Sequence, residues 1–142
     1  VEGWAHYCEE MVIGAGLARE DDTLELGQLA ESLVRLCRMI VGIRLHVEDL
    51  SVEQGVRFFC EEAYLGEASA RREAERGTFD RSYVLNSAGR LMLLKLRADL
   101  EAREGAAFSL KSFHDRLLGQ GAVPRWLHRT LLLGDTGDDL LE

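Results

Sequence analysis

Proline, aromatic residues and long apolar runs are all scarce in this chain of 142 residues. Pro124 is the single proline, and aromatic side chains make up only 7% of the sequence. Because leucine, alanine, glutamate and arginine are abundant instead, the composition favours helices over strands. No apolar run approaches the roughly 20 residues that a membrane-spanning helix requires. The sequence therefore predicts a helical protein with no membrane partner.

Positive charge is also in short supply. The chain has 17 lysines and arginines against 25 aspartates and glutamates, which gives a net charge of −8. Its basic residues are scattered and form no stripe that could follow a phosphate backbone. The sequence also lacks the GxxxxGK and GxGxxG patterns that cradle nucleotide phosphates, and the GxSxG pattern of serine hydrolases. These absences argue against a nucleic-acid partner and against nucleotide chemistry.

The cysteines Cys8, Cys37 and Cys60 are odd in number and share no close spacing, so they do not predict a structural zinc site. Cys37 and Cys60 lie in apolar stretches, which is typical of buried, reduced thiols. We therefore expect a reducing, cytoplasmic location. No signal peptide is visible, but the chain starts at Val1 without a methionine, so a targeting segment could precede it.

Apolar residues recur at helical spacing through almost the whole chain, and we find no strand pattern or repeat. We predict an all-α fold, a single bundle of six or seven helices with short loops. Helices at about residues 22–48 and 80–103 should be central and buried, because the first is apolar nearly all round from Cys37 to Val47 and the second carries a dense leucine run. Residues 1–133 would form one domain and residues 134–142 an acidic tail.

Helix starts are marked by residues with capping chemistry. Asp22 with Glu25, and Ser51 with Gln54, have the spacing of a capping box. Asp80 and Ser109 can act as N-caps, because their side-chain oxygens accept from free backbone N–H groups. Pro124 suits the first turn of the last helix.

Polar residues interrupt the apolar pattern in the second half of the long helix. Arg38, Gly42 and His46 are spaced by four, so they lie on one helical face. A buried arginine or histidine must be hydrogen-bonded or paired. Two interpretations stay open at this point. Arg38 and His46 could be satisfied by neighbouring carboxylates or carbonyls, or they could line a polar pocket with His46 at its edge.

The first helix carries Glu2, His6 and Glu9 on one side. Helical periodicity alone interprets this side as a solvated face. A carboxylate and an imidazole at this spacing could bind a metal ion, but two ligands are too few for a zinc site. His114 and His128 also lie in patterns that predict exposed faces.

The segment Glu2–Glu9 reads EGWAHYCE and resembles the EGWAxYxE signature of the domain-of-unknown-function-885 (DUF885) proteins. Further segments resemble other motifs of that family in the same order, so the resemblance covers about residues 2–133. They are RMIVGIRLH at Arg38–His46, the stretch Ser51–Phe58, the segment Arg76–Leu96 and the closing segment Glu104–Gly121.

The DUF885 proteins resemble helical zinc metallopeptidases of the gluzincin type. The resemblance implies zinc held by two histidines of an upstream HExxH helix, whose glutamate acts as general base. It implies that Glu2 is the third metal ligand. It also implies that His46 and a tyrosine from a later helix stabilise the oxyanion, with a peptide as substrate of the full protein.

The sequence departs from the family pattern at the expected chemistry. HExxH is absent, and a lone Glu2 cannot retain zinc, since a catalytic site needs three protein ligands. Gly42 stands where the family has aspartate, and Arg81 stands where it has proline. Asn86 occupies the position of the expected tyrosine, so we predict a degenerate catalytic position there. The isolated chain should bind no zinc and hydrolyse no peptide.

Two functions therefore stay open. The chain is a C-terminal fragment of a zinc-dependent peptidase-like protein, with the missing N-terminal half as its partner. Alternatively, it is a non-catalytic helical interaction module or homodimer derived from that scaffold. The first predicts an uncovered surface around Glu2 and His46. The second predicts that a symmetric mate covers the same surface.

Overall fold

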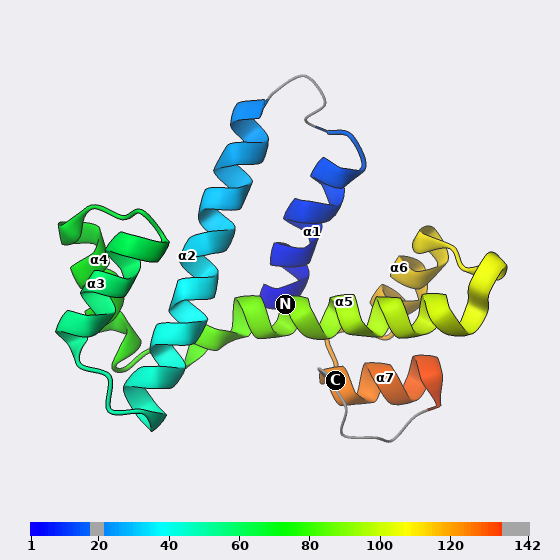
Figure 1. Cartoon of the computed structure of the whole chain (residues 1–142). Coiled ribbons are helices and arrows are strands. Elements are labelled where there is room, and N and C mark those ends of the chain that lie inside the picture. Colours follow the sequence, from blue (N-terminus) through cyan, green and yellow to red (C-terminus); the bar gives the residue numbers. More distant parts are fainter. Residues whose placement is uncertain (18–21, 135–142) are drawn as a thin grey trace.

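The all-α class is confirmed. The structure, a computed structural model, describes residues 1–17 and 22–134, and these form seven α-helices and two short 3-10 helices, without a strand (Figure 1). The 3-10 helices are η1 at Arg81–Val84 and η2 at Gly105–Ala107. The α-helices are α1 at Glu2–Gly14, α2 at Asp22–Val47, α3 at Val52–Glu62, α4 at Glu67–Gly77, α5 at Leu85–Glu104, α6 at Leu110–Gly119 and α7 at Arg125–Leu133.

Three of the four predicted N-caps are present, whereas Asp22 is the first residue within α2 and does not precede it. Ser51 Oγ accepts from the backbone N–H of Gln54 at 3.2 Å, and the Ser51 N–H donates to Gln54 Oε1 at 2.8 Å, which completes the capping box. Asp80 caps η1 and Ser109 caps α6. Pro124 lies one position earlier than predicted, at the N-cap of α7. Of the predicted acidic tail at 134–142, only Gly134 lies within the described residues.

The helices pack around two separate apolar cores. The first core joins α2, α3, α4 and η1, and the second joins α1, α5, α6 and α7. In Figure 1 the helix α5 runs across the molecule, with α3 and α4 beyond one end and α6 and α7 at the other. The first core contains Val34, Cys37, Val41, Val56, Phe59, Ala63, Ala70, Ala74 and Tyr83, and the second contains Tyr7, Leu93, Leu96, Leu100, Phe113, Leu117 and Leu132.

Helices α1 and α5 touch backbone to backbone at a pair of glycines. A Cβ atom added to Gly3 would lie 2.4 Å from the carbonyl carbon of Gly89 and 2.5 Å from its Cα. A Cβ atom on Gly89 would in turn lie 2.9 Å from the Cα of Gly3. Only glycine fits at either position, because the obstructing atoms are backbone and cannot rotate away. The two glycines therefore fix where the first turn of α1 lies on α5.

The burial of α2 is one-sided. Its inner face supplies Val34, Cys37 and Val41 to the first core. The sequence predicted burial nearly all round from Cys37 to Val47, but Ile43 is 45% exposed and Val47 is 72% exposed. Ile43 and Val47 border one cleft, and Leu29, Leu33 and Leu36 border another that faces α1 and α5, so a stripe of apolar side chains is only partly covered. We call this stripe the α2 seam, and it consists of Leu26, Leu29, Leu33, Leu36, Ile40, Ile43 and Val47.

Candidate functional site

Glu2 lies exposed in the first turn of α1. Among the described residues its carboxylate has no hydrogen bond or ion pair. A carboxylate in the first helical turn stabilises a helix by about 0.3–1 kcal/mol through the helix dipole. An aspartate would interact with the helix dipole equally well, so this interaction does not explain why the residue is a glutamate.

The next residues of the motif are used for packing. Gly3 makes the glycine contact with α5. Trp4 and Tyr7 pack in edge-to-face contacts with His114 of α6, with ring centroids 5.5 and 5.6 Å from its ring. The Tyr7 hydroxyl and His114 Nε2 are 2.8 Å apart and share a hydrogen bond. The prediction of an exposed His114 is therefore wrong, because its face of α6 meets α1.

His6 is buried, with only 1% of its surface exposed, which corrects the prediction of a solvated face. Its Nε2 lies 3.0 Å from Ser32 Oγ, which also accepts from the side-chain amide of Gln28 at 2.8 Å. Its Nδ1 has no hydrogen-bond partner among the described residues. Burial lowers the pKa of His6, and the positive charges of Arg35 and Arg90 lower it further. The imidazole is therefore neutral at pH 7.

Glutamates on the same side of α1 form ion pairs that tie it to its neighbours. Glu9 makes a two-pronged pair with Arg35 of α2, and Glu10 accepts from Arg90 Nε of α5 at 2.7 Å. Periodicity could not reveal these pairs, because a charged residue that faces another helix has the same spacing as one that faces water. Within the motif, Glu2 is thus the charged residue without a structural partner.

Arg38 has a full set of partners in the first core. It donates to Glu73 from Nε and from Nη2, each at 2.7 Å, and the Tyr83 hydroxyl donates to the same carboxylate at 2.6 Å. The hydrogen bond to Glu73 raises the pKa of Arg38, and the hydrogen bond from Arg38 lowers the pKa of Glu73. Burial raises the pKa of Tyr83 well above its ordinary value. This network is structural, since every charge in it is paired.

His46 is exposed at the end of α2, where its Nε2 hydrogen-bonds the carbonyl of Gly77 at 3.1 Å. It borders a cleft of about 380 Å³ that is also lined by Gly42, Asp80 and Tyr83. Hydrogen bonds from Ser82 and Arg76 lower the pKa of Asp80 to about 2. The cleft therefore carries a permanent carboxylate beside an accessible imidazole.

Gly42 packs directly against Tyr83. A Cβ atom there would lie 3.3 Å from the Tyr83 Cβ, so an aspartate at this position would require the tyrosine to shift by a few tenths of an ångström. Asn86 is half-buried on α5, and its backbone carbonyl acts to raise the pKa of His6 against the larger effect of burial.

The described residues do not bring Glu2, His46 and Asn86 into one cleft. His46 lines the cleft beside Tyr83, whereas Glu2 and Asn86 line none of the clefts found. Residues 1–17 and 22–134 also contain no group of three histidine, cysteine or acidic side chains that could hold a metal ion. The residues present therefore do not make a zinc site by themselves, and the roles of these three residues stay predictions.

The sequence analysis missed two buried or half-buried polar residues beside the second core, His128 and Arg125. His128 is 1% exposed, although its pattern predicts an exposed face, and Arg125 lines an apolar pocket beside it. Both lie on a short amphipathic helix, where a polar residue at the edge of the apolar face is not distinguished from a solvated one by spacing.

Known proteins resemble this chain in sequence and in structure. The chain matches the family described as "Bacterial protein of unknown function (DUF885)" over residues 1–129. The structure of a candidate lipoprotein from Colwellia psychrerythraea is 31% identical, with a TM-score of 0.88 over 94% of this chain and 23% of that protein. A candidate lipoprotein of unknown function from Shewanella oneidensis is 26% identical, with a TM-score of 0.84 over 94% of this chain and 24% of its own length.

No curated protein sequence matches the chain. The chain spans about a quarter of the length of the two similar proteins. Among the described helices, none combines the length and the apolar character that crossing a bilayer requires. The descriptions of the two proteins as candidate lipoproteins give no support to the expected cytoplasmic location.

Proposed function

Since this chain belongs to the DUF885 family of bacterial proteins, we propose that it is the C-terminal helical part of a zinc-dependent, peptidase-like protein. Glu2 supplies the third metal ligand, and His46 lies on the oxyanion side of the site. The remaining ligands come from an upstream HExxH helix that this sequence does not contain. Zinc held by Glu2 and those upstream residues would supply Lewis-acid chemistry for peptide hydrolysis. The isolated chain is inactive, because zinc needs three protein ligands.

The chemistry of Glu2 supports this proposal. Its neighbours in the motif are held by packing, hydrogen bonds or ion pairs within the chain, whereas the Glu2 carboxylate points to no described partner. The glycine contact nevertheless fixes the backbone beside it. A side chain that is anchored at its base and free at its tip is suited to bind something outside the chain.

The α2 seam is the observation that carries the fragment proposal. Its seven apolar residues are separated alternately by three and four positions, from Leu26 to Val47. This is the heptad spacing with which one helix packs along another over several turns. Isolated apolar side chains on a surface are normal, but a continuous stripe of this length is typical of an interface. We infer that a long amphipathic helix covers it.

We assign that covering helix to the upstream part of the parent protein. The two similar proteins each contain roughly three quarters of their length outside the region matched here, which is ample to supply such a helix. Peptides remain the proposed substrate, because the family resemblance implies them. The cleft beside His46 would then lie where the two parts meet.

For the parent protein we propose a lipid-anchored location in the cell envelope in place of the cytoplasm. The support is that both similar proteins are described as candidate lipoproteins. Fractionation of cells that produce the parent would test this proposal. Recovery of the protein in the soluble cytoplasmic fraction would contradict it.

The zinc content of the parent protein tests the role of Glu2. We expect the parent, produced with its upstream segment, to hold one zinc ion per chain and to lose most of it in Glu2→Gln. Glu101→Gln is the matched control, because Glu101 is equally exposed but lies on α5 outside the motif. Equal zinc content in both variants would show that Glu2 is not a ligand.

The second candidate function is a non-catalytic homodimer, and the replacements at Gly42 and Asn86 favour it. Light scattering of the purified chain separates the two. A stable dimer that becomes monomeric in Ile40→Glu, but not in Leu131→Glu on the exposed side of α7, would favour the module. A monomer that binds a separately produced upstream segment would favour the fragment.

A further inference from the structure

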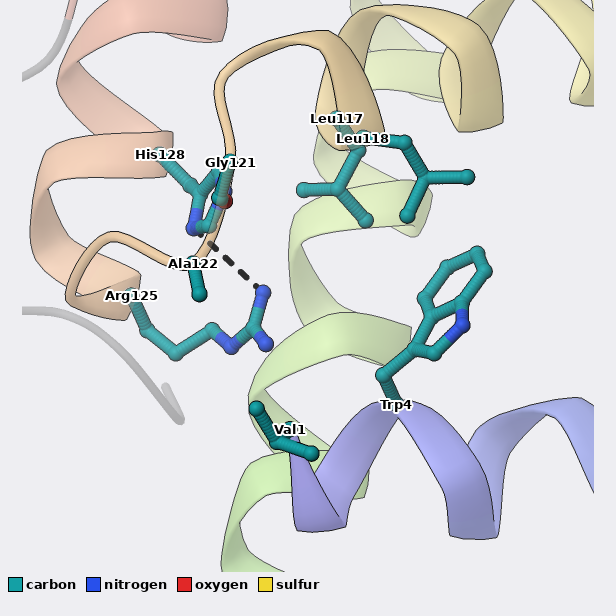
Figure 2. Close-up of a pocket in the computed structure, with 8 residues that line it drawn as sticks. All are labelled: Val1, Trp4, Leu117, Leu118, Gly121, Ala122, Arg125 and His128. Atoms are coloured by element: carbon teal, nitrogen blue, oxygen red, sulfur yellow. Dashed lines mark hydrogen bonds between the residues drawn. The ribbon is translucent and has the colours of Figure 1, made fainter.

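An apolar pocket lies far from the cleft of His46, between the start of α1 and the corner that joins α6 to α7 (Figure 2). Its volume is about 270 Å³. Trp4 of α1 and Leu117 and Leu118 of α6 supply its apolar walls, and Arg125 and His128 of α7 supply its polar side. On a helix, Trp4 projects to a different side of α1 from Glu2, so this pocket is separate from the proposed metal site.

Arg125 and His128 form one hydrogen-bonded unit. Arg125 Nη1 donates to His128 Nδ1 at 3.3 Å, since an arginine has no acceptor to offer. The other ring nitrogen, Nε2, must then carry the proton, and it donates to the carbonyl of Gly121 at 3.1 Å. Burial and the charge of Arg125 both lower the pKa of His128, so the ring is neutral. The unit therefore carries a single positive charge, on Arg125.

That charge has no counter-ion within the described part of the chain. None of the ion pairs includes Arg125, and burial alone lowers its pKa. An unpaired charge that is partly removed from water is unfavourable. The N-terminus of α7 adds to the positive potential, because Pro124 provides no side-chain cap. In Figure 2 the guanidinium reaches into the space between Val1, Ala122 and Trp4.

We propose that this pocket binds a small monocarboxylate with an apolar body. The carboxylate pairs with the guanidinium of Arg125, and the apolar body packs on Trp4 and Leu117. Charge complementarity selects the anion, because a charge-assisted pair with a guanidinium is strong and often two-pronged. The apolar walls and the small volume select a single short tail. A medium-chain fatty acid and the carboxyl end of a leucine-type peptide share this chemistry.

Calorimetric titration of the full 142-residue chain tests the proposal. Octanoate and N-acetyl-leucine represent the two sources, and N-acetyl-leucinamide is the neutral control. We expect both acids to bind and the amide to bind at least about tenfold more weakly, because it lacks the charge-assisted bond. The tighter of the two acids identifies the source. An amide that binds as tightly as its acid would overturn the proposal, and so would the absence of binding by both acids.

A variant of Arg125 separates binding from folding. Arg125→Gln should weaken octanoate binding at least about tenfold. It should lower the melting temperature only slightly, because it removes one hydrogen bond to His128 but breaks no ion pair within the described residues. Arg57→Gln, an exposed arginine on α3, is the matched control and should leave binding unchanged. A lower melting temperature with unchanged binding would mean that Arg125 is structural and would overturn the assignment.

Nuclear magnetic resonance localises the ligand and identifies a competitor. The indole N–H signal of Trp4 should shift on addition of octanoate, whereas that of Trp126, on the exposed side of α7, should not. The chain itself ends in apolar and acidic residues, Leu140, Leu141 and Glu142. If octanoate binds only after residues 135–142 are deleted, the tail is the occupant and the proposal of a free ligand is wrong.

Discussion

The two cores of the molecule differ in how they treat buried polar groups. In the first core, Arg38, Glu73 and Tyr83 satisfy one another completely. Around the second core, several buried polar atoms lack a partner among the described residues: Nδ1 of His6, Oγ of Ser87 and Oε1 of Gln120. Arg125 adds an unpaired charge to the same part of the molecule.

Buried polar groups are normally satisfied, so an unsatisfied one calls for an explanation. In the network of Arg38, Glu73 and Tyr83 the charged groups already pair with one another, so they are not available to a ligand. Around the second core, by contrast, unused hydrogen-bonding capacity remains. His6 and Arg125 each line a cleft, where a ligand, a water molecule or another part of the parent protein could use that capacity. The contrast indicates that the polar groups buried in the first core serve the fold, whereas those around the second core remain available to a ligand or partner.

Among the substitutions that test this difference between the cores, Gly3→Ala should cause the largest loss of stability. The new Cβ would meet the backbone of Gly89, so α1 must move away from the second core. We expect a loss of about 3–5 kcal/mol in the free energy of unfolding, as in severe overpacking. Chemical denaturation followed by circular dichroism would measure it. The control Gly27→Ala, which has open space around it on α2, should instead gain about 0.5–1 kcal/mol.

The next largest effect should come from the finished network of the first core. Glu73→Ala leaves Arg38 half-buried without its carboxylate and removes an acceptor of Tyr83. We expect a loss of about 2 kcal/mol in the free energy of unfolding, which is less than for a fully buried pair. In contrast, Arg125→Gln should cost no more than about 1 kcal/mol, because it removes one hydrogen bond to His128 and no ion pair within the described residues. If the two substitutions proved equally destabilising, the distinction between the cores would not hold.

Mild acid should weaken the second core before the first. Burial lowers the pKa values of His6, His114 and His128, all near the second core, below the ordinary 6.5. The unfolded chain therefore binds protons first, and stability that is fully present above pH 6.5 is lost as the pH falls through the folded-state values. The pKa of Glu73 is lowered from 4.5, so its contribution to the first core is complete above about pH 4.5 and is lost only as the pH falls below that value toward the folded-state pKa.

Hydrogen exchange at pH 7 and pH 5 would test this order. We expect the amides of α6 and α7 to lose more protection at pH 5 than those of α3 and α4. His128→Gln should reduce the difference, because it removes one of the groups that must stay neutral. Equal loss of protection in both cores would argue against a role for the buried histidines.

The smallest effect is expected on the α2 seam. Leu33→Gln should change the free energy of unfolding of the isolated chain by no more than about 1 kcal/mol, because 38% of the residue is already exposed. Its neighbour Val34 faces the first core, and Val34→Ala should cost about 2 kcal/mol. A large loss in Leu33→Gln would mean that the seam is already covered in the isolated chain, as in a dimer.

The helices and several of their caps could be predicted because their signals are local. Ser51 and Gln54 lie three residues apart, and their capping chemistry needs no knowledge of the rest of the fold. The helix at residues 22–48 was predicted to be central and buried for an equally local reason, since its apolar spacing is that of a buried helix. Whether the segment that packs on the α2 seam belongs to this chain or to another part of the protein depends on the whole fold. It cannot be predicted from the residues of the seam.

The polar residues were harder to assign. His6 and His128 are single polar side chains in amphipathic helices, so their burial depends on which helix lies opposite, which spacing does not reveal. The significance of Glu2 came from family resemblance alone. Structure adds a physical reason to examine it, because the rest of the motif is occupied by packing and pairing within the chain.

The contact between Gly3 and Gly89 has a consequence for how this surface can change over time. Side chains drift in size as sequences diverge, and helices that rest on side chains shift with them. A contact between two main chains does not depend on side-chain size, so the position of α1 on α5 stays fixed while other helix positions vary. Glu2 is the residue next to Gly3 and therefore lies beside this contact. Its position can therefore be inherited unchanged even while the cores on either side are rebuilt.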